Sequence, residues 1–198
     1  MNKFKRGVIK MGNAGTKSGE SIKTVDLVYI AIAAALIAVC SWISIPMTVP
    51  FTLQTFAVFF VLAALGGERG TIATVVYVIM GAVGLPVFSG FKGGISVLLG
   101  NTGGYIIGFI FMGLIYMFIT KVLGEKMIPM MIALIIGLAA CYAFGTAWFM
   151  FVYIRNTGAV GIVTVLSWCV FPFIIPDLVK MALALVVSKR VRFIIRHD

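Results

Sequence analysis

The chain has 198 residues, of which 62% are hydrophobic and only 11% are charged, and its mean hydropathy is +1.14. A soluble domain carries about 25% charged residues, because it must present polar groups to water over its whole surface. Too few are present here to cover a globule of this size, which excludes a soluble domain. The composition predicts an all-α, multi-pass integral protein of the cell membrane, with the lipid bilayer as its main solvent.

The formal net charge of +10 does not indicate a nucleic-acid partner. Most of the Lys and Arg residues flank apolar stretches, which is where membrane proteins carry them. The three cysteines lie far apart in apolar stretches, and the single histidine, His197, is next to the last residue. Neither a metal-site spacing nor a redox motif is present, so no metal and no cofactor are expected.

Apolar runs of about 20 residues are long enough to cross a bilayer as helices. Residues 1–24 are polar and basic, and we expect them to form a cytoplasmic tail. Six candidate helices follow, at 25–45, 51–66, 70–86, 101–122, 127–152 and 173–191. The sequence therefore predicts a six-helix membrane domain over residues 25–191, followed by a second basic cytoplasmic tail over 192–198.

The stretch 158–171 is apolar, but Pro172 and Pro176 follow it closely. We expect a loop or a short packed segment there. Both prolines suit the start of the last helix, where a missing N–H has no intrahelical role.

The orientation follows from the 16 Lys and Arg residues. With six crossings, most of them fall on the side of the two termini, whereas Lys92 and Arg155 fall on the opposite side and Lys180 lies within the last helix. Because basic residues accumulate on the cytoplasmic side, both termini are expected in the cytoplasm.

The first helix carries two pairs of alanines at a spacing of four, Ala31 with Ala35 and Ala34 with Ala38. Residues spaced by four share a helix face, and small side chains let another helix approach closely. The approaching helix can belong to this chain or to a partner, and the spacing alone leaves both open.

Two polar residues lie at the expected external ends of helices. Gln54 begins the second helix and can hydrogen-bond across helices. Asn101 opens the fourth helix, where it is a credible N-cap. Taken together with Asp177 and Lys180, they place four polar side chains at one depth on three helices, which indicates a binding site.

The glycines at 100, 104 and 108 repeat every four residues along the fourth helix. Close helix packing explains such a stripe, and space for a ligand beside the helix is the alternative. The chain has no Walker A motif, so we expect ATP to be bound only by partner subunits.

Asp177 and Lys180 lie three residues apart in the apolar stretch PFIIPDLVK. A charged residue at the centre of a membrane helix costs roughly 2.5–3.5 kcal/mol, so its presence needs a reason. At this spacing the two side chains share a face and can neutralise each other. They form either an ion pair that anchors the helix or the polar end of a ligand pocket.

The stretches TVPFTLQTFAVF, GLPVFSG, LGNTGGYIIGF and PFIIPDLVK resemble the BioY family, the biotin-specific S components of energy-coupling factor (ECF) transporters. The resemblance covers about residues 25–190, and its blocks occur in the family's order. It implies a six-helix S-component fold that captures biotin from outside. It also implies a separate module, made of a transmembrane coupling protein and two cytoplasmic ATPases.

The resemblance carries site roles as well. The alanine face at Ala31, Ala34, Ala35 and Ala38 matches the family's docking face for the coupling protein. The family's acidic–basic pair maps onto Asp177 and Lys180. The family commonly has Gly before that Asp, whereas this chain has Pro176, which puts the geometry of the pocket rim in question.

Biotin offers two ureido N–H donors, one carbonyl, a thioether ring and a four-carbon chain that ends in a carboxylate. We hypothesise that Asp177 accepts the ureido N–H groups while Asn101 or Lys180 donates to the carbonyl. In the reverse pose Lys180 pairs with the carboxylate, and the sequence does not choose between the two. Gln54 and Tyr105 complete the expected binding residues.

The competing function is a self-sufficient secondary transporter of a small carboxylate or vitamin, driven by protons or sodium. Such a protein needs an intramembrane relay and often shows inverted repeats, and neither is evident here beyond Asp177. An intramembrane enzyme is not expected, because no nucleophile–base pair lies within the apolar stretches.

Overall fold

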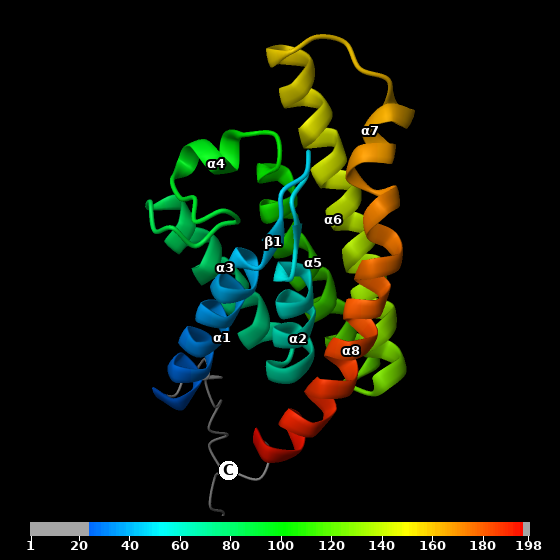
Figure 1. The fold of residues 1–198 in the computed structure, drawn as a ribbon. Helices are drawn as coiled ribbons and strands as arrows, with labels where there is room; N and C mark the ends of the chain where they lie inside the picture. Colours follow the sequence, from blue (N-terminus) through cyan, green and yellow to red (C-terminus); the bar gives the residue numbers. More distant parts are fainter. Residues whose placement is uncertain (1–23, 196–198) are drawn as a thin grey trace, which may run out of the picture.

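The computed structural model describes residues 24–195, most of which lie in helices that run roughly along one axis (Figure 1). Residues 1–23, which make up nearly all of the expected N-terminal tail, and residues 196–198 lie outside the described residues. The N-terminal end of the first helix and the C-terminal end of the last helix lie at the same end of the molecule (Figure 1).

Each of the six expected stretches contains a helix: α1 (Thr24–Trp42), α2 (Gln54–Leu65), α3 (Gly67–Ala82), α5 (Gly103–Leu123), α6 (Met127–Asn156) and α8 (Phe171–Ile195). The short helix α4 (Ile95–Leu99) precedes α5. The stretch 158–171 contains α7 (Ile162–Cys169), which buries Val165 and Cys169, so it is a short packed segment.

Four stretches of the described chain are long and apolar enough to cross a membrane: Thr24–Trp42, Gly103–Leu123, Met127–Asn156 and Ile162–Arg192. Helices α2 and α3 have 12 and 16 residues. At 1.5 Å per residue they measure about 18 and 24 Å, which is less than the roughly 30 Å of a hydrocarbon core. The protein is therefore a helical, multi-pass membrane protein, but two of the six expected helices are shorter than a full crossing.

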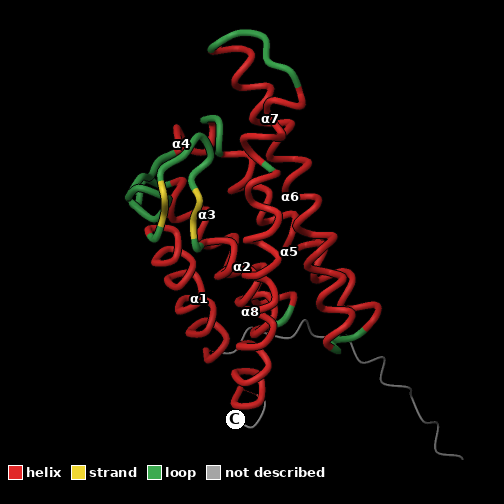
Figure 2. Tube along the Cα trace, turned by 45° about the vertical axis from the view of Figure 1, so that its right-hand side comes forward, coloured by secondary structure: helices red, strands yellow, loops and turns green. Residues whose placement is uncertain are grey.

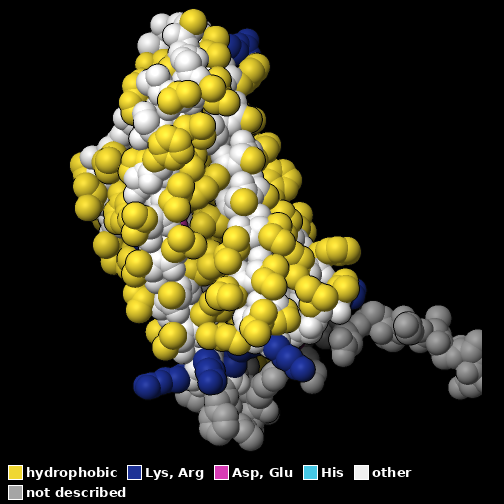
Figure 3. Space-filling model, turned by 90° about the vertical axis from the view of Figure 1, so that its right-hand side faces the viewer, with side chains coloured by type: hydrophobic (Ala, Val, Ile, Leu, Met, Phe, Trp, Pro, Cys, Tyr) yellow, Lys and Arg dark blue, Asp and Glu magenta, His cyan; other side chains and the backbone are white. Residues whose placement is uncertain are grey.

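The outer surface agrees with a lipid environment. Large apolar side chains such as Phe118, Ile128 and Leu183 are more than half exposed. Figure 3 shows apolar side chains over most of one face, with Lys and Arg gathered at its lower end. This distribution is inverted relative to a water-soluble domain and matches a protein whose sides face acyl chains.

Two irregular connections cover the opposite end of the bundle (Figures 1 and 2). One holds the antiparallel strands β1 (Ser44–Ile45) and β2 (Phe51–Thr52), with Ser44 opposite Thr52. The other is the glycine-rich connection between α3 and α4, in which the N–H of Phe88 donates to the carbonyl of Lys92 at 2.9 Å. Both connections contribute to the site described below.

Close packing of α5 on α6 explains two of the spaced glycines. A Cβ on Gly104 would lie 2.3 Å from Cβ of Trp148, and one on Gly108 would lie 2.8 Å from Sγ of Cys141. These positions therefore exclude any larger residue, which is the helix-packing explanation. Gly100 lies before α5 and does not take part in this stripe.

Two expectations about helix ends are wrong. The cap of α5 is Thr102, without a side-chain hydrogen bond, so Asn101 lies outside the helix and does not cap it. Helix α8 begins at Phe171, which places Pro172 in the first turn but Pro176 inside the helix. The helix starts earlier than expected because only Val170 separates it from α7, so the chain needs no loop there.

Candidate functional site

A cavity of about 390 Å³ lies among the start of α2, the helices α4 to α8 and the two connections. This volume is within the range of small-molecule pockets. Its apolar wall includes Val49, Phe88, Ile106, Phe109, Leu138 and Phe173. Its polar wall includes Thr52, Gln54, Thr55, Ser89, Lys92, Ser96, Asn101, Thr102, Tyr105, Tyr142 and Asp177.

The structure brings together four of the five binding residues expected from the sequence. Gln54, Asn101, Tyr105 and Asp177 all line this cavity, although they come from segments far apart in the chain. Lys180 is not among the lining residues. In the ion pair of the last helix, the carboxylate of Asp177 therefore lines the cavity, whereas the ammonium of Lys180 does not.

Both carboxylate oxygens of Asp177 accept a hydrogen bond. Oδ1 accepts from Nζ of Lys180 at 2.9 Å, and Oδ2 accepts from the hydroxyl of Tyr142 at 2.7 Å. The Asp177 residue is only 2% exposed. A carboxylate held from two sides keeps one orientation, and each oxygen still has a lone pair for a ligand donor.

Lys180 uses its ammonium within the protein. Besides Asp177, it donates to the carbonyl of Thr52 at 2.8 Å, and it lies 4.1 Å from the ring centroid of Phe51. An ammonium has three donors, and these three contacts occupy the group. Lys180 therefore connects α8 to strand β2 and fixes Asp177 beside that strand.

Gln54 carries an unused donor. The residue is 5% exposed, and its Nε2 has no hydrogen-bond partner among the described residues. Buried polar groups in folded proteins are nearly always bonded, because an unpaired one costs about 1–3 kcal/mol. Since Gln54 lies on the cavity wall, a ligand acceptor is the natural partner for this amide.

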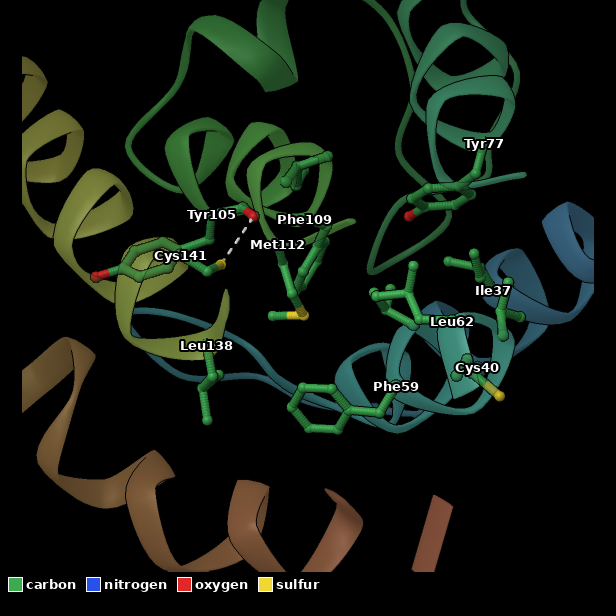
Figure 4. Close-up of a cluster of buried hydrophobic side chains, with 14 of the residues drawn as sticks. Ile37, Cys40, Phe59, Leu62, Tyr77, Tyr105, Phe109, Met112, Leu138 and Cys141 are labelled. Carbon is green, nitrogen blue, oxygen red and sulfur yellow. Dashed lines mark hydrogen bonds between the residues drawn. The ribbon is translucent and has the colours of Figure 1, made fainter. Parts of the chain in front are cut away.

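Tyr105 lines the cavity, and Figure 4 shows its carbonyl oxygen beside the sulfur of Cys141. Its hydroxyl hydrogen-bonds Oγ1 of Thr146 at 3.0 Å, and its carbonyl accepts from Sγ of Cys141. Gly145 leaves room for the ring, because a Cβ there would lie 2.2 Å from it. The ring is thus held in one position, as a wall for an apolar ligand group requires.

Two of the lining residues that were not expected from the sequence, Tyr142 and Lys92, bear on the chemistry of the site. Tyr142 lies in the apolar run of α6, and nothing in that run indicates that its hydroxyl reaches Asp177. Lys92 was counted only as an external charge, although its glycine-rich surroundings in SGFKGG are a signal of a close backbone approach. Both residues depend on tertiary contacts between distant segments.

The two alanine pairs of α1 lie on different faces. Ala34 and Ala38 are buried, with 1% and 4% of their surface exposed, so they pack within this chain. Ala31 and Ala35 are exposed. Packing within this chain therefore explains Ala34 and Ala38, whereas Ala31 and Ala35 lie on the outer face of α1.

This arrangement suits the binding of a small molecule that is polar at its ends and apolar between them. One wall offers a fixed acceptor and an unused donor, the middle offers aromatic and aliphatic surface, and Lys92 contributes a cation from the α3–α4 connection.

Comparison with known proteins agrees with this description. The model of the BioY family matches residues 13–197. The chain is 40% identical to "Biotin transporter BioY" of Thermotoga maritima, over 84% of this chain and 95% of the relative. It is 37% identical to "Probable biotin transporter BioY" of Pyrococcus horikoshii, over 86% and 98%. A solved structure, the S-component for biotin from an ECF-type ABC transporter, matches with a TM-score of 0.75 and 27% identity, over 85% of this chain and 90% of that one.

Proposed function

The chain belongs to the BioY family, and from that premise we propose that it is the biotin-binding membrane subunit of an ECF-type vitamin importer. It is a transport protein and not an enzyme. It captures biotin on the external side and delivers it together with a partner module that hydrolyses ATP. The observation that carries this proposal is the pair of groups on one cavity wall, the fixed acceptor Asp177 and the unused donor Gln54.

A ureido group needs an acceptor for its N–H groups and a donor for its carbonyl. Asp177 supplies the acceptor, and Nε2 of Gln54 supplies the donor. The two residues are neighbours in space, because Lys180 bonds both Asp177 and the carbonyl of Thr52, two residues before Gln54. Hydrogen bonds to charged groups contribute about 1.5–3 kcal/mol each, so Asp177 dominates the polar part of binding.

The bicyclic ring and the chain of biotin fit the apolar middle of the cavity. Phe109, Leu138 and Phe173 line it, and Tyr105 stands beside them. Burial of four methylenes contributes roughly 3 kcal/mol, at about 0.8 kcal/mol each. Asn101 also lines the cavity and offers a further polar contact to the ligand.

We infer the orientation from charge. Lys121, Lys126, Lys189 and Arg190 are exposed at the end of the molecule where α8 finishes, which supports a cytoplasmic location for that end and for the start of α1. The six expected helices then traverse the membrane domain, the four long stretches by themselves and the shorter α2 and α3 together with the connections that complete the external side. The cavity opens to the outside in this arrangement.

Ala31 and Ala35 form the docking face for the transmembrane coupling protein of the module. They are exposed small residues one turn apart, a pattern that lets a partner helix approach closely. Ala34 and Ala38 support this face from inside the bundle. The two ATPase subunits of the module bind ATP, and this chain does not.

Titration of the purified full-length chain in detergent tests the function. Calorimetry with biotin should show saturable one-to-one binding, whereas thiamine, a vitamin without a ureido group or a carboxylate, should not bind. Uptake of labelled biotin by cells should require co-expression of the coupling protein and active ATPases. Absence of biotin binding, or uptake that continues with inactive ATPases, contradicts the proposal.

A further inference from the structure

The cation that the sequence singles out is not available to a ligand. Lys180 already contacts Asp177, the carbonyl of Thr52 and the ring of Phe51, and it does not line the cavity. A ligand carboxylate could reach its ammonium only by displacing one of these contacts. The anionic end of the ligand therefore needs another partner.

Lys92 is the only basic residue that lines the cavity within the described part of the chain. It comes from the α3–α4 connection, which lies on the left in Figure 1, whereas α8, which carries Asp177, lies on the right. Its side chain is exposed, and no ion pair of its ammonium is found among residues 24–195. A ligand held by Asp177 at one end thus extends toward a free cation.

The turn that carries Lys92 is held in a strained conformation. Phe91 has a φ of +56°, which is uncommon for a bulky residue and costs free energy unless its surroundings impose it. Its ring stacks on that of Trp42 with centroids 5.1 Å apart, and the indole N–H of Trp42 donates to the carbonyl of Pro86 at 2.8 Å. We call these contacts the Trp42–Phe91 clamp, because they fix both sides of the turn to the end of α1.

The backbone next to Lys92 is equally constrained. The bond from the N–H of Phe88 to the carbonyl of Lys92 closes the turn. A Cβ on Gly93 would lie 2.3 Å from the carbonyl oxygen of Leu85, so the chain passes too close there for any other residue. A strained turn with several independent restraints is typical of a segment that must present one side chain in one place.

We infer that Lys92 binds the terminal carboxylate of the ligand and selects for an anionic end, and that the Trp42–Phe91 clamp positions it. Lys180 acts through Asp177 and does not contact the ligand. This inference rests on the proposed function, and it chooses between the two poses that the sequence leaves open: the ureido group lies at Asp177 and the carboxylate at the α3–α4 connection.

Two ligands that differ only at the carboxyl group test the inference: biotin, and biotinamide, in which a neutral carboxamide replaces the carboxylate. The full-length protein in detergent should prefer biotin. Lys92→Gln should weaken biotin binding about five- to twentyfold, as expected for a charge-assisted contact at a partly solvated rim, and should leave biotinamide binding unchanged. Lys92→Arg should retain most of the preference. Arg155→Gln removes a basic residue near the same end that does not line the cavity, and it should change neither affinity.

The roles of the other residues are separable in the same assay. Lys180→Met should weaken both ligands by the same factor, because its effect passes through the ureido site. Trp42→Leu should lower the preference for biotin, and the same change should have little further effect in the Lys92→Gln background. A merely structural role of Trp42 would instead weaken both ligands equally, and this result would overturn the clamp.

Three results would overturn the carboxylate assignment: an unchanged preference in Lys92→Gln, an equal loss for both ligands in that variant, or a loss confined to biotin in Lys180→Met. If the unmodified protein binds neither ligand, the proposed function itself fails. If it binds biotin tightly without a preference over biotinamide, the proposed function stands and the inference fails.

Discussion

The carboxylate of Asp177 accepts one bond from Lys180 and one from Tyr142, and a carboxamide cannot accept both. Asp177→Asn should therefore lose one of the two acceptor oxygens and the charge that strengthens the bonds to the ureido group, and it should leave Lys180 buried without an anion. The affinity for biotin should fall at least about tenfold, since bonds to charged groups contribute about 1.5–3 kcal/mol. Calorimetry on the monodisperse fraction measures this loss.

The matched control is Asp26→Asn. Asp26 forms an ion pair with Arg69 at 2.9 Å, near the start of α1 and away from the cavity. The same chemical change there should leave biotin affinity unaltered. If the Asp177→Asn protein binds biotin as tightly as the unmodified protein, Asp177 does not contact the ligand.

Replacing Gln54 should affect the stability of the ligand-free protein and the affinity for biotin differently. Gln54→Leu removes a buried donor that has no partner in the described chain, so the ligand-free protein should be as stable or more stable, by up to about 1 kcal/mol. The affinity for biotin should nevertheless fall, because the ureido carbonyl loses its donor. Thermal unfolding without ligand and calorimetry with biotin measure the two effects. A parallel loss of stability and affinity would indicate a structural role only.

At the level of the helices, a substitution on the exposed face of α1 should affect the transport of biotin but not its binding. Ala35→Trp places a bulky group on the exposed face and should leave biotin affinity unchanged while uptake that depends on the module is lost. Val186→Trp makes the corresponding change at an exposed position of α8 and should not affect uptake. Binding assays in detergent and uptake assays in cells distinguish the two steps. Normal uptake by Ala35→Trp would exclude this face as the docking surface.

The contact between α5 and α6 depends on glycine. Gly104→Ala inserts a methyl group where Trp148 leaves 2.3 Å, which should destabilise the protein by about 1–3 kcal/mol. Gly161→Ala is the control, because a Cβ there meets only the Thr164 hydroxyl, at 3.8 Å, and the backbone has an ordinary φ of −72°. Thermal unfolding in detergent should separate the two variants, and equal melting temperatures would mean that the helices can move apart at little cost.

For the whole molecule, the prediction concerns its orientation in the membrane. Single cysteines at positions 189 and 155, introduced into a cysteine-free protein, should react with a membrane-impermeant thiol reagent from opposite sides. The site from Arg155→Cys should be labelled in intact cells, and that from Lys189→Cys only after lysis, because basic residues accumulate at the end of α8. Labelling of both sites in intact cells would contradict the cytoplasmic location of the C-terminus.

The positions of the helices could be predicted from the sequence because hydropathy is a local property. A run of apolar residues crosses lipid as a helix whatever its neighbours are, so α1 and α6 begin within one residue of the expected positions. The ends of α5 and α8 were less predictable. Asn101 and Pro176 have residue types that suit helix starts, but the surrounding packing places those starts at Gly103 and Phe171.

In the site, too, some residues could be predicted from their local sequence, whereas others are placed by contacts with distant segments. Asp177, Gln54 and Asn101 were predictable, because a polar group in an apolar stretch costs free energy and needs a partner. The positions of Tyr142 and Lys92 on the cavity wall were not, since each depends on which face of a helix or turn meets a segment far away in the chain.

The sequence by itself determined that this chain is a helical membrane protein and which stretches enter the lipid. It also determined that Asp177 and Lys180 share a helix face on which they can neutralise each other, and that their presence there needs a reason. Each of these points follows from the cost of polar groups in hydrocarbon. Only the tertiary structure decided that Asp177 faces the cavity while Lys180 turns to Thr52 and Phe51, and that Lys92 joins the wall from a distant connection. The reason is that hydropathy measures the free-energy cost of burying each group, and this cost can be read from the sequence. The direction in which a side chain points depends instead on contacts between helices and connections that are far apart in the sequence.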